Sequence, residues 1–163
     1  MKQILGFIIL VLMIIGCAEQ GVEVDQLRES TYVIHRAGYD PVRGLVTFTE
    51  LAPGKIQVEI NLENTDDRYD FPAHLHFGTI NEVGELAFKL HDVTGNTGVS
   101  STILENVKLS SGEIFTYDLL QEMNGSVKIH LSDDLFKHVV LAYGNIGANE
   151  NYLSDGVTVC TGH

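Results

Sequence analysis

The chain has 163 residues, of which 44% are hydrophobic, and it carries a formal net charge of −12 at pH 7. A protein this acidic is not expected to bind nucleic acid, because contacts to phosphate depend on lysine and arginine side chains. It also has no cluster of basic residues that would attract an anionic lipid surface, so its charge indicates solubility and attraction of cations.

Residues 4–15 form an almost unbroken apolar run near the N-terminus. A bilayer span needs about 20 apolar residues, so this run is too short to cross and instead has the length of the apolar core of a signal peptide. The segment Ile-Ile-Gly-Cys at residues 14–17 resembles the lipobox of bacterial lipoproteins, in which the cysteine becomes the lipidated N-terminus after cleavage. We therefore predict a signal peptide at residues 1–16 and lipidation of Cys17. An ordinary signal peptide with an incidental cysteine is the alternative.

Residue 18, directly after the predicted lipid attachment site, is alanine. Because no aspartate stands there to retain the protein at the inner membrane, the resemblance implies a lipid anchor in the outer membrane, facing the periplasm. Residues 17–31 then form the lipidated cysteine and a polar, acidic tether, and residues 32–163 form one domain of ordinary size. With Cys17 lipidated, Cys160 has no partner cysteine, so no intramolecular disulfide is expected.

After the tether, short β-rich segments alternate with turns rich in Gly, Asn, Asp and Pro. The clearest pattern is in residues 55–62, where four aliphatic residues alternate with polar ones and predict a half-buried strand. Residues 92–101 are predicted as a loop, and residues 115–123 offer the nearest helical alternative to a strand. Many short strands with frequent turns indicate an all-β antiparallel sandwich or barrel. Strands are predicted at residues 32–36, 44–51, 55–62, 72–78, 84–93, 102–109, 114–120, 126–131, 139–143 and 156–160.

The segment at residues 72–78 contains His74 and His76, separated by one residue. In a strand, side chains at positions i and i+2 leave the same face of the sheet, so the two imidazoles can share one metal ion. Imidazole suits copper, zinc, iron and nickel. A chance pairing, or two polar residues on a surface strand, is the alternative explanation.

Five segments between residues 38 and 148 follow one another in a particular order. They are Gly-Tyr-Asp-Pro-Val-Arg-Gly at 38–44, His-Leu-His-Phe-Gly at 74–78, His91 fifteen residues after His76, Ile-His at 129–130 followed by Asp-Asp-Leu at 133–135, and Gly-Asn-Ile-Gly-Ala at 144–148. In order and in near-matching spacing they resemble the copper–zinc superoxide dismutase family. The resemblance implies that family's fold, an eight-stranded Greek-key β-barrel, which agrees with the predicted strands.

The resemblance also implies a metal site, with one copper ion held by His74, His76, His91 and His130. In the family, copper alternates between Cu(II) and Cu(I), so that one superoxide is oxidised to oxygen and the next is reduced to peroxide. The resemblance gives His91 the catalytic role of the histidine that releases copper on reduction and supplies a proton. Asp133 or Asp134 is then expected to orient a ligand imidazole from outside the first coordination sphere.

Several features of the family's site are missing from this sequence. No histidine occurs between His91 and His130, so a zinc site of the family type is not expected. Asn149 stands near the position of the arginine that steers superoxide, and no Arg or Lys follows Lys137. The charged loop is shortened to residues 136–143, and the family's disulfide has no second cysteine. The resemblance thus predicts copper without zinc, in an acidic protein that repels superoxide instead of attracting it.

Three functions are compatible with the sequence. The first is a lipid-anchored copper protein that dismutates superoxide. The second is a copper-binding or copper-handling lipoprotein on the same fold without enzymatic activity. The third is a metal-free β-sandwich, such as a chordin-type repeat domain, whose strands can also carry two histidines at this spacing. Of the other histidines, His35 and His138 are predicted to be structural or solvated, whereas Cys160 and His163 form a terminal pair with donors suited to Cu(I).

Overall fold

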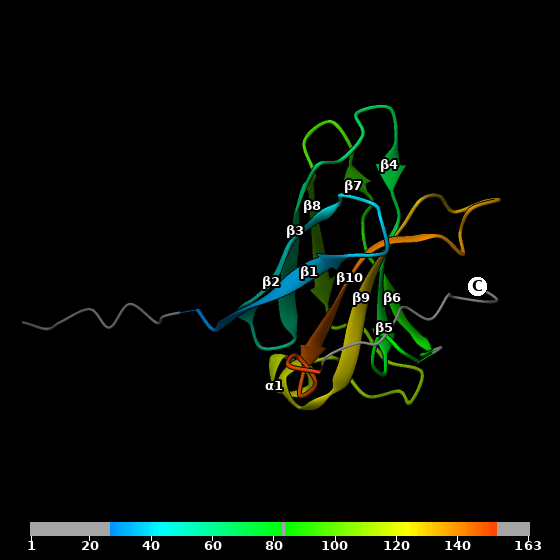
Figure 1. Ribbon diagram of the computed structural model, residues 1–163. Helices are drawn as coiled ribbons and strands as arrows, with labels where there is room; N and C mark the ends of the chain where they lie inside the picture. The colour runs from blue at the N-terminus through cyan, green and yellow to red at the C-terminus, as the bar shows by residue number, and fades with distance from the viewer. Residues whose placement is uncertain (1–26, 83, 153–163) are drawn as a thin grey trace, which may run out of the picture.

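The computed structural model describes residues 27–82 and 84–152, which form ten strands and one short helix. All strand pairs are antiparallel, and the strands join edge to edge into one strongly curved sheet (Figure 1). The strands are β1 (Glu29–Arg36), β2 (Arg43–Ala52), β3 (Lys55–Glu63), β4 (Asp70–Phe71), β5 (Ala73–Phe77), β6 (Leu86–Lys89), β7 (Val93–Thr94), β8 (Val99–Glu105), β9 (Asn124–His130) and β10 (Val140–Gly147), and the helix is α1 (Tyr117–Glu122). The prediction of an all-β antiparallel fold is confirmed.

The strands lie across the sheet in the order β4-β7-β8-β3-β2-β1-β10-β9-β5-β6. β1 pairs with both β2 and β10 and so joins the two halves of the sheet. The β5–β6 hairpin comes between β3 and β8 in sequence, but it pairs with β9 in the other half, while β3 pairs with β8. Such crossovers are those of a Greek-key arrangement. β4 and β7 have only two residues each, so eight of the ten strands are longer than that.

The hydrophobic core lies inside the curve of the sheet. The four aliphatic residues of β3 that were predicted to share a face are all buried, whereas the residues between them keep contact with solvent. Phe48 of β2 is also fully buried, and its ring meets the ring of Tyr32 edge-on with centroids 5.9 Å apart. Alternation with a period of two therefore places one face of each central strand in the core.

The strand predicted at residues 114–120 is wrong, because α1 occupies residues Tyr117–Glu122. Thr116 caps the helix: its side chain accepts a hydrogen bond from the backbone N–H of Leu119 at 3.2 Å. Tyr117 and Leu120, three residues apart, are buried on one side of the helix. An N-cap and a single apolar pair are sufficient for this short helix, since the pair is stabilised by packing against the core.

Replacing Thr116 with alanine is expected to lower the free energy of unfolding by about 1 kcal/mol, because the N–H of Leu119 loses its acceptor. Urea unfolding measures this change. Thr116→Ser keeps the accepting hydroxyl and serves as the control, with little change expected. Equal losses for the two variants would contradict the capping role.

Several other boundaries differ from the predictions: β6 is shorter than the strand predicted at 84–93, and β10 extends beyond the strand predicted at 139–143. β1 begins at Glu29 inside the predicted tether, because Arg28 anchors the chain there by hydrogen bonds of 2.5 Å to both Glu50 and Asp118. β7 and the start of β8 lie within the predicted loop at residues 92–101. The strand predicted at 156–160 and the signal peptide with Cys17 lie outside the described residues. Among the described residues, no helix has the length and apolar character needed to cross a membrane.

Candidate metal centre

Three of the four histidines singled out in the sequence lie together. One ring nitrogen from each of His74, His76 and His130 lies within 4.8 Å of the others. The rings of His74 and His130 are 4.8 Å apart between centroids, and those of His74 and His76 are 5.9 Å apart. All three side chains are buried, with exposed fractions of 8%, 0% and 1% respectively. The described residues therefore contain a buried group of three imidazoles.

The pairing of β5 with β9 brings the three rings together. The register sets Ala73 opposite Ile129, so His74 lies opposite Lys128. His130 follows one residue later, and its backbone N–H donates to the carbonyl of Pro72 at 2.8 Å. The intervening apolar side chains of both strands belong to the hydrophobic core, so the histidines project from the opposite face of the sheet. The predicted common face of the histidine pair agrees with this arrangement.

The orientation of the His76 ring is set by a backbone carbonyl. Nδ1 of His76 lies 3.1 Å from the carbonyl oxygen of Gly84, which can only accept a hydrogen bond. Nδ1 therefore carries the proton, and Nε2 keeps the lone pair that a metal requires. Gly84 approaches closely because it has no side chain: a Cβ there would lie 1.5 Å from the carbonyl oxygen of Phe77.

His91 is not part of this group. Its side chain is exposed, and its Nδ1 lies 2.8 Å from the carbonyl oxygen of Ser101. Its backbone N–H donates to the hydroxyl of Thr102 at 2.8 Å. The hydrogen bonds of His91 are thus made to residues of β8, whereas the other three histidines lie on β5 and β9. The four-histidine set that the resemblance implies is reduced here to three that converge.

Asp133 and Asp134, expected beside a ligand imidazole, are both exposed. Asp133 is close enough to Asp92 to act on its carboxyl group. Partial burial raises the pKa of Asp92, and the negative charges of Asp133 and Asp70 raise it further. The surface next to His91 therefore concentrates carboxylates, and this like-charge cluster opposes the ionisation of Asp92.

Replacing Asp92 with asparagine is expected to raise the unfolding temperature at pH 7. The raised pKa means that the folded chain holds the Asp92 proton more tightly than the unfolded chain, so ionisation destabilises the fold as pH rises above the ordinary value of 3.8. The gain should vanish well below that value, where Asp92 is protonated in both states. Thermal unfolding at both pH values measures it, with exposed Asp134→Asn as the control. A gain that persists in acid would contradict the electrostatic cause.

Two polar residues of β9 on the same face as the histidines were missed by sequence reasoning. Ser126 and Lys128 are fully buried. Lys128 reaches the backbone carbonyl of Glu82 with its Nζ at 3.3 Å. In the sequence they alternate with Val127 and Ile129, which is the usual pattern of a strand with one solvated face. Nothing in that alternation indicates that the polar face is covered as well.

The donor set suits a transition metal. Three neutral imidazoles bind copper, zinc, iron or nickel, whereas calcium and magnesium require oxygen ligands. Two nitrogens bound to one ion at about 2.0–2.1 Å can lie no more than roughly 4.2 Å apart. The ring nitrogens, which lie within 4.8 Å of one another, therefore have to move closer together around an ion. The other predicted metal-binding pair, Cys160 and His163, lies outside the described residues.

Comparison of the chain with family models, with curated proteins and with solved structures gives no match. The resemblance to copper–zinc superoxide dismutase therefore stays a prediction from the sequence motifs. The functional assignment depends on the chemistry of the three buried histidines.

Proposed function

We propose that this protein binds one copper ion through His74, His76 and His130. The observation that supports the proposal is the burial of three imidazoles, within 4.8 Å of one another, on the paired strands β5 and β9. Three imidazole nitrogens on one face of a sheet, close enough to reach a single ion, are the kind of ligand set that copper, zinc, iron and nickel bind. A purely structural role accounts less well for three such rings on one face.

Copper is favoured over the other candidate metals on two grounds. Among divalent first-row ions, sites of a given type bind copper most tightly, and this group contains no carboxylate among the described residues. The sequence, whose motif order resembles copper–zinc superoxide dismutase, also lacks the histidines that bind zinc in that family. When bound, copper supplies one-electron exchange between its two common oxidation states. The protein's part is to hold the rings, with Nδ1 of His76 protonated against Gly84, and to limit access of water.

The test is metal loading of the protein followed by elemental analysis. One equivalent of copper is expected for the parent chain, and a large loss for His76→Ala, because two imidazoles bind far more weakly than three. His138→Ala is the matched control, since His138 is exposed and lies outside the group. Equal copper contents in the His76 and His138 variants would refute the site. A parent chain without copper would favour a metal-free β-sandwich of the chordin type.

Superoxide dismutation is a second candidate function. The observation in its favour is that His91 is exposed, with Nδ1 held by the carbonyl of Ser101. That bond leaves the other ring nitrogen for proton exchange with solvent. For an enzyme, superoxide is expected to decay faster in the presence of the copper-loaded parent chain than in the presence of His76→Ala. His91→Ala is expected to slow this decay without changing the copper content. No acceleration over His76→Ala would leave a copper-binding or copper-handling protein without enzymatic activity.

We further propose that the protein acts in the cell envelope, anchored by a lipid on Cys17. The support is the sequence Ile-Ile-Gly-Cys at the end of the apolar run. Labelling of cells with a radioactive fatty acid should mark the parent chain and not Cys17→Ser. Labelling of both would contradict the anchor at this cysteine.

A further inference from the structure

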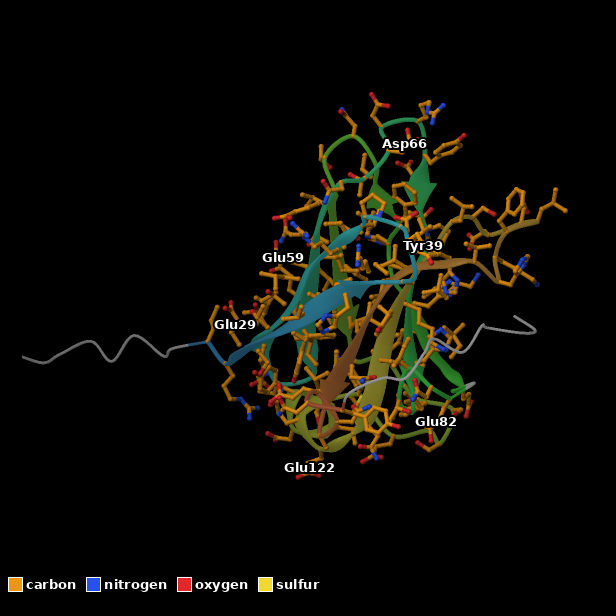
Figure 2. The ribbon with its side chains drawn as sticks, viewed as in Figure 1. Glu29, Tyr39, Glu59, Asp66, Glu82 and Glu122 are labelled. Carbon is orange, nitrogen blue, oxygen red and sulfur yellow. The ribbon has the colours of Figure 1, made fainter. Side chains whose placement is uncertain are left out.

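The loop between β5 and β6 is fastened to the sheet by three side chains from three strands. Asn145 of β10 accepts a hydrogen bond from the backbone N–H of Ile80 at 2.9 Å through its Oδ1. Lys128 of β9 donates to the carbonyl of Glu82 at 3.3 Å. His76 of β5 meets the carbonyl of Gly84 at 3.1 Å. The contacts fall on every second residue of the loop, and Figure 2 shows Glu82 at the turn of this hairpin.

Two of these three side chains are expensive to bury. Lys128 is fully buried, and Asn145 has an exposed fraction of 7%. An ammonium group or an amide removed from water destabilises the fold unless it is hydrogen-bonded. Leucine or methionine would fill the same space at lower cost. Asn145 also donates through its Nδ2 to the carbonyl of Tyr152 at 3.0 Å, so its amide joins the loop to the segment that follows β10. The contacts of Asn145 and Lys128 with the loop are thus part of what compensates for their burial.

The backbone held in this way is the one that orients His76. Thr79 and Glu82 close a turn within the loop, where the N–H of Thr79 donates to the carboxylate of Glu82 at 2.6 Å. Two residues beyond Glu82, the carbonyl of Gly84 receives Nδ1–H of His76. A shift of the loop would remove that acceptor and free the ring to rotate or to exchange its tautomer. Partners of this kind raise the metal affinity of a histidine.

We propose that Asn145 and Lys128 are positioning residues of the metal site, holding the loop so that Gly84 keeps His76 with its Nε2 directed to the ion. The inference rests on the proposed copper site. In the metal-free protein, the tautomer of His76 then depends on Lys128 of β9 and Asn145 of β10.

The first test compares two lysine variants by competition for copper with a chelator. Lys128→Met, which keeps the length of the side chain, is expected to free the loop that carries Gly84. Copper binding should then weaken by up to about 10- to 100-fold, the effect of losing the hydrogen-bond partner of a metal-binding histidine. Lys89→Met is the matched control, because Lys89 of β6 also lies opposite His74 in the strand register but is exposed. Equal weakening by both variants would assign the effect to lost charge and would overturn the positioning role of Lys128.

The second test reads the tautomer of His76 in the metal-free chain by NMR of the imidazole nitrogens. The parent should show a proton on Nδ1, and Asn145→Ala should show a mixture of tautomers. Asn149→Ala is the control: Asn149 is also a buried asparagine, but it accepts from Gly125 and not from the loop. Circular dichroism checks that each variant is folded. If Asn145→Ala is not folded, the tautomer of His76 is measured by NMR in Lys128→Met instead.

The two tests separate the inference from the proposed function. If the parent chain fails to bind copper, the proposed function falls, while the NMR measurement still decides whether Asn145 and Lys128 control the ring of His76. If the parent binds copper and the variants keep both its affinity and its tautomer, the inference is overturned and the copper site stands.

Discussion

If copper binds the proposed site in the folded chain only, copper at a hundredfold excess over its dissociation constant is expected to raise the free energy of unfolding by about 2.7 kcal/mol. The folded state brings His74, His76 and His130 within 4.8 Å of one another, although the third is far from the pair in sequence. The unfolded chain cannot offer that arrangement. The added stability should raise the unfolding temperature by on the order of 10 °C.

Thermal unfolding with copper and with a chelator measures this effect. In His76→Ala the copper-dependent increase should largely disappear, whereas in His138→Ala it should be complete. An increase of the same size in the parent and in His76→Ala would mean that copper binds elsewhere, and it would count against the three-histidine site. Zinc tested in the same way shows whether the site discriminates between the two metals.

Replacing Phe48 with alanine is expected to lower the free energy of unfolding by about 3–5 kcal/mol. Phe48 is fully buried in the central strand β2 and contacts Tyr32. Its truncation removes apolar contacts and leaves a cavity that the surrounding strands can fill only in part. Since domains of this size are stable by roughly 5–15 kcal/mol in total, the loss is a large share of the stability.

Urea unfolding of the two chains measures this loss. Phe136→Ala is the matched control, because Phe136 carries the same side chain on the surface, with an exposed fraction of 53%. That variant should change the stability by no more than about 0.5 kcal/mol. Similar losses in both variants would contradict the placement of the core inside the curve of the sheet.

The fold class was predictable because its signal is local. In β3 the alternation of aliphatic and polar residues follows directly from the geometry of a strand, and the structure buries the predicted face. The helix α1 was not predicted, because its six residues carry only one apolar pair at helical spacing, and the β-branched and aromatic residues at 114–117 favour a strand. Its formation depends on the cap at Thr116 and on packing against the core.

The site was predictable only in part, for a related reason. The shared face of His74 and His76 is a property of one strand, so spacing alone predicts it. The resemblance added His130 correctly to the group and added His91 as well, whose ring is instead held by Ser101 of β8. The positions of the histidines along the chain do not define which ring nitrogen binds a metal ion. Nor do they define which backbone carbonyl accepts a hydrogen bond from the other ring nitrogen.

The sequence by itself determined that this is an all-β protein and that two histidines leave one strand on one side. Only the tertiary structure decided that this side is covered, that the register of β5 against β9 brings His130 to the pair, and that Lys128 and Asn145 hold the loop beside it. The physical reason is that alternation and spacing act within one strand, whereas register, burial and hydrogen bonds between distant segments depend on the packing of the whole sheet.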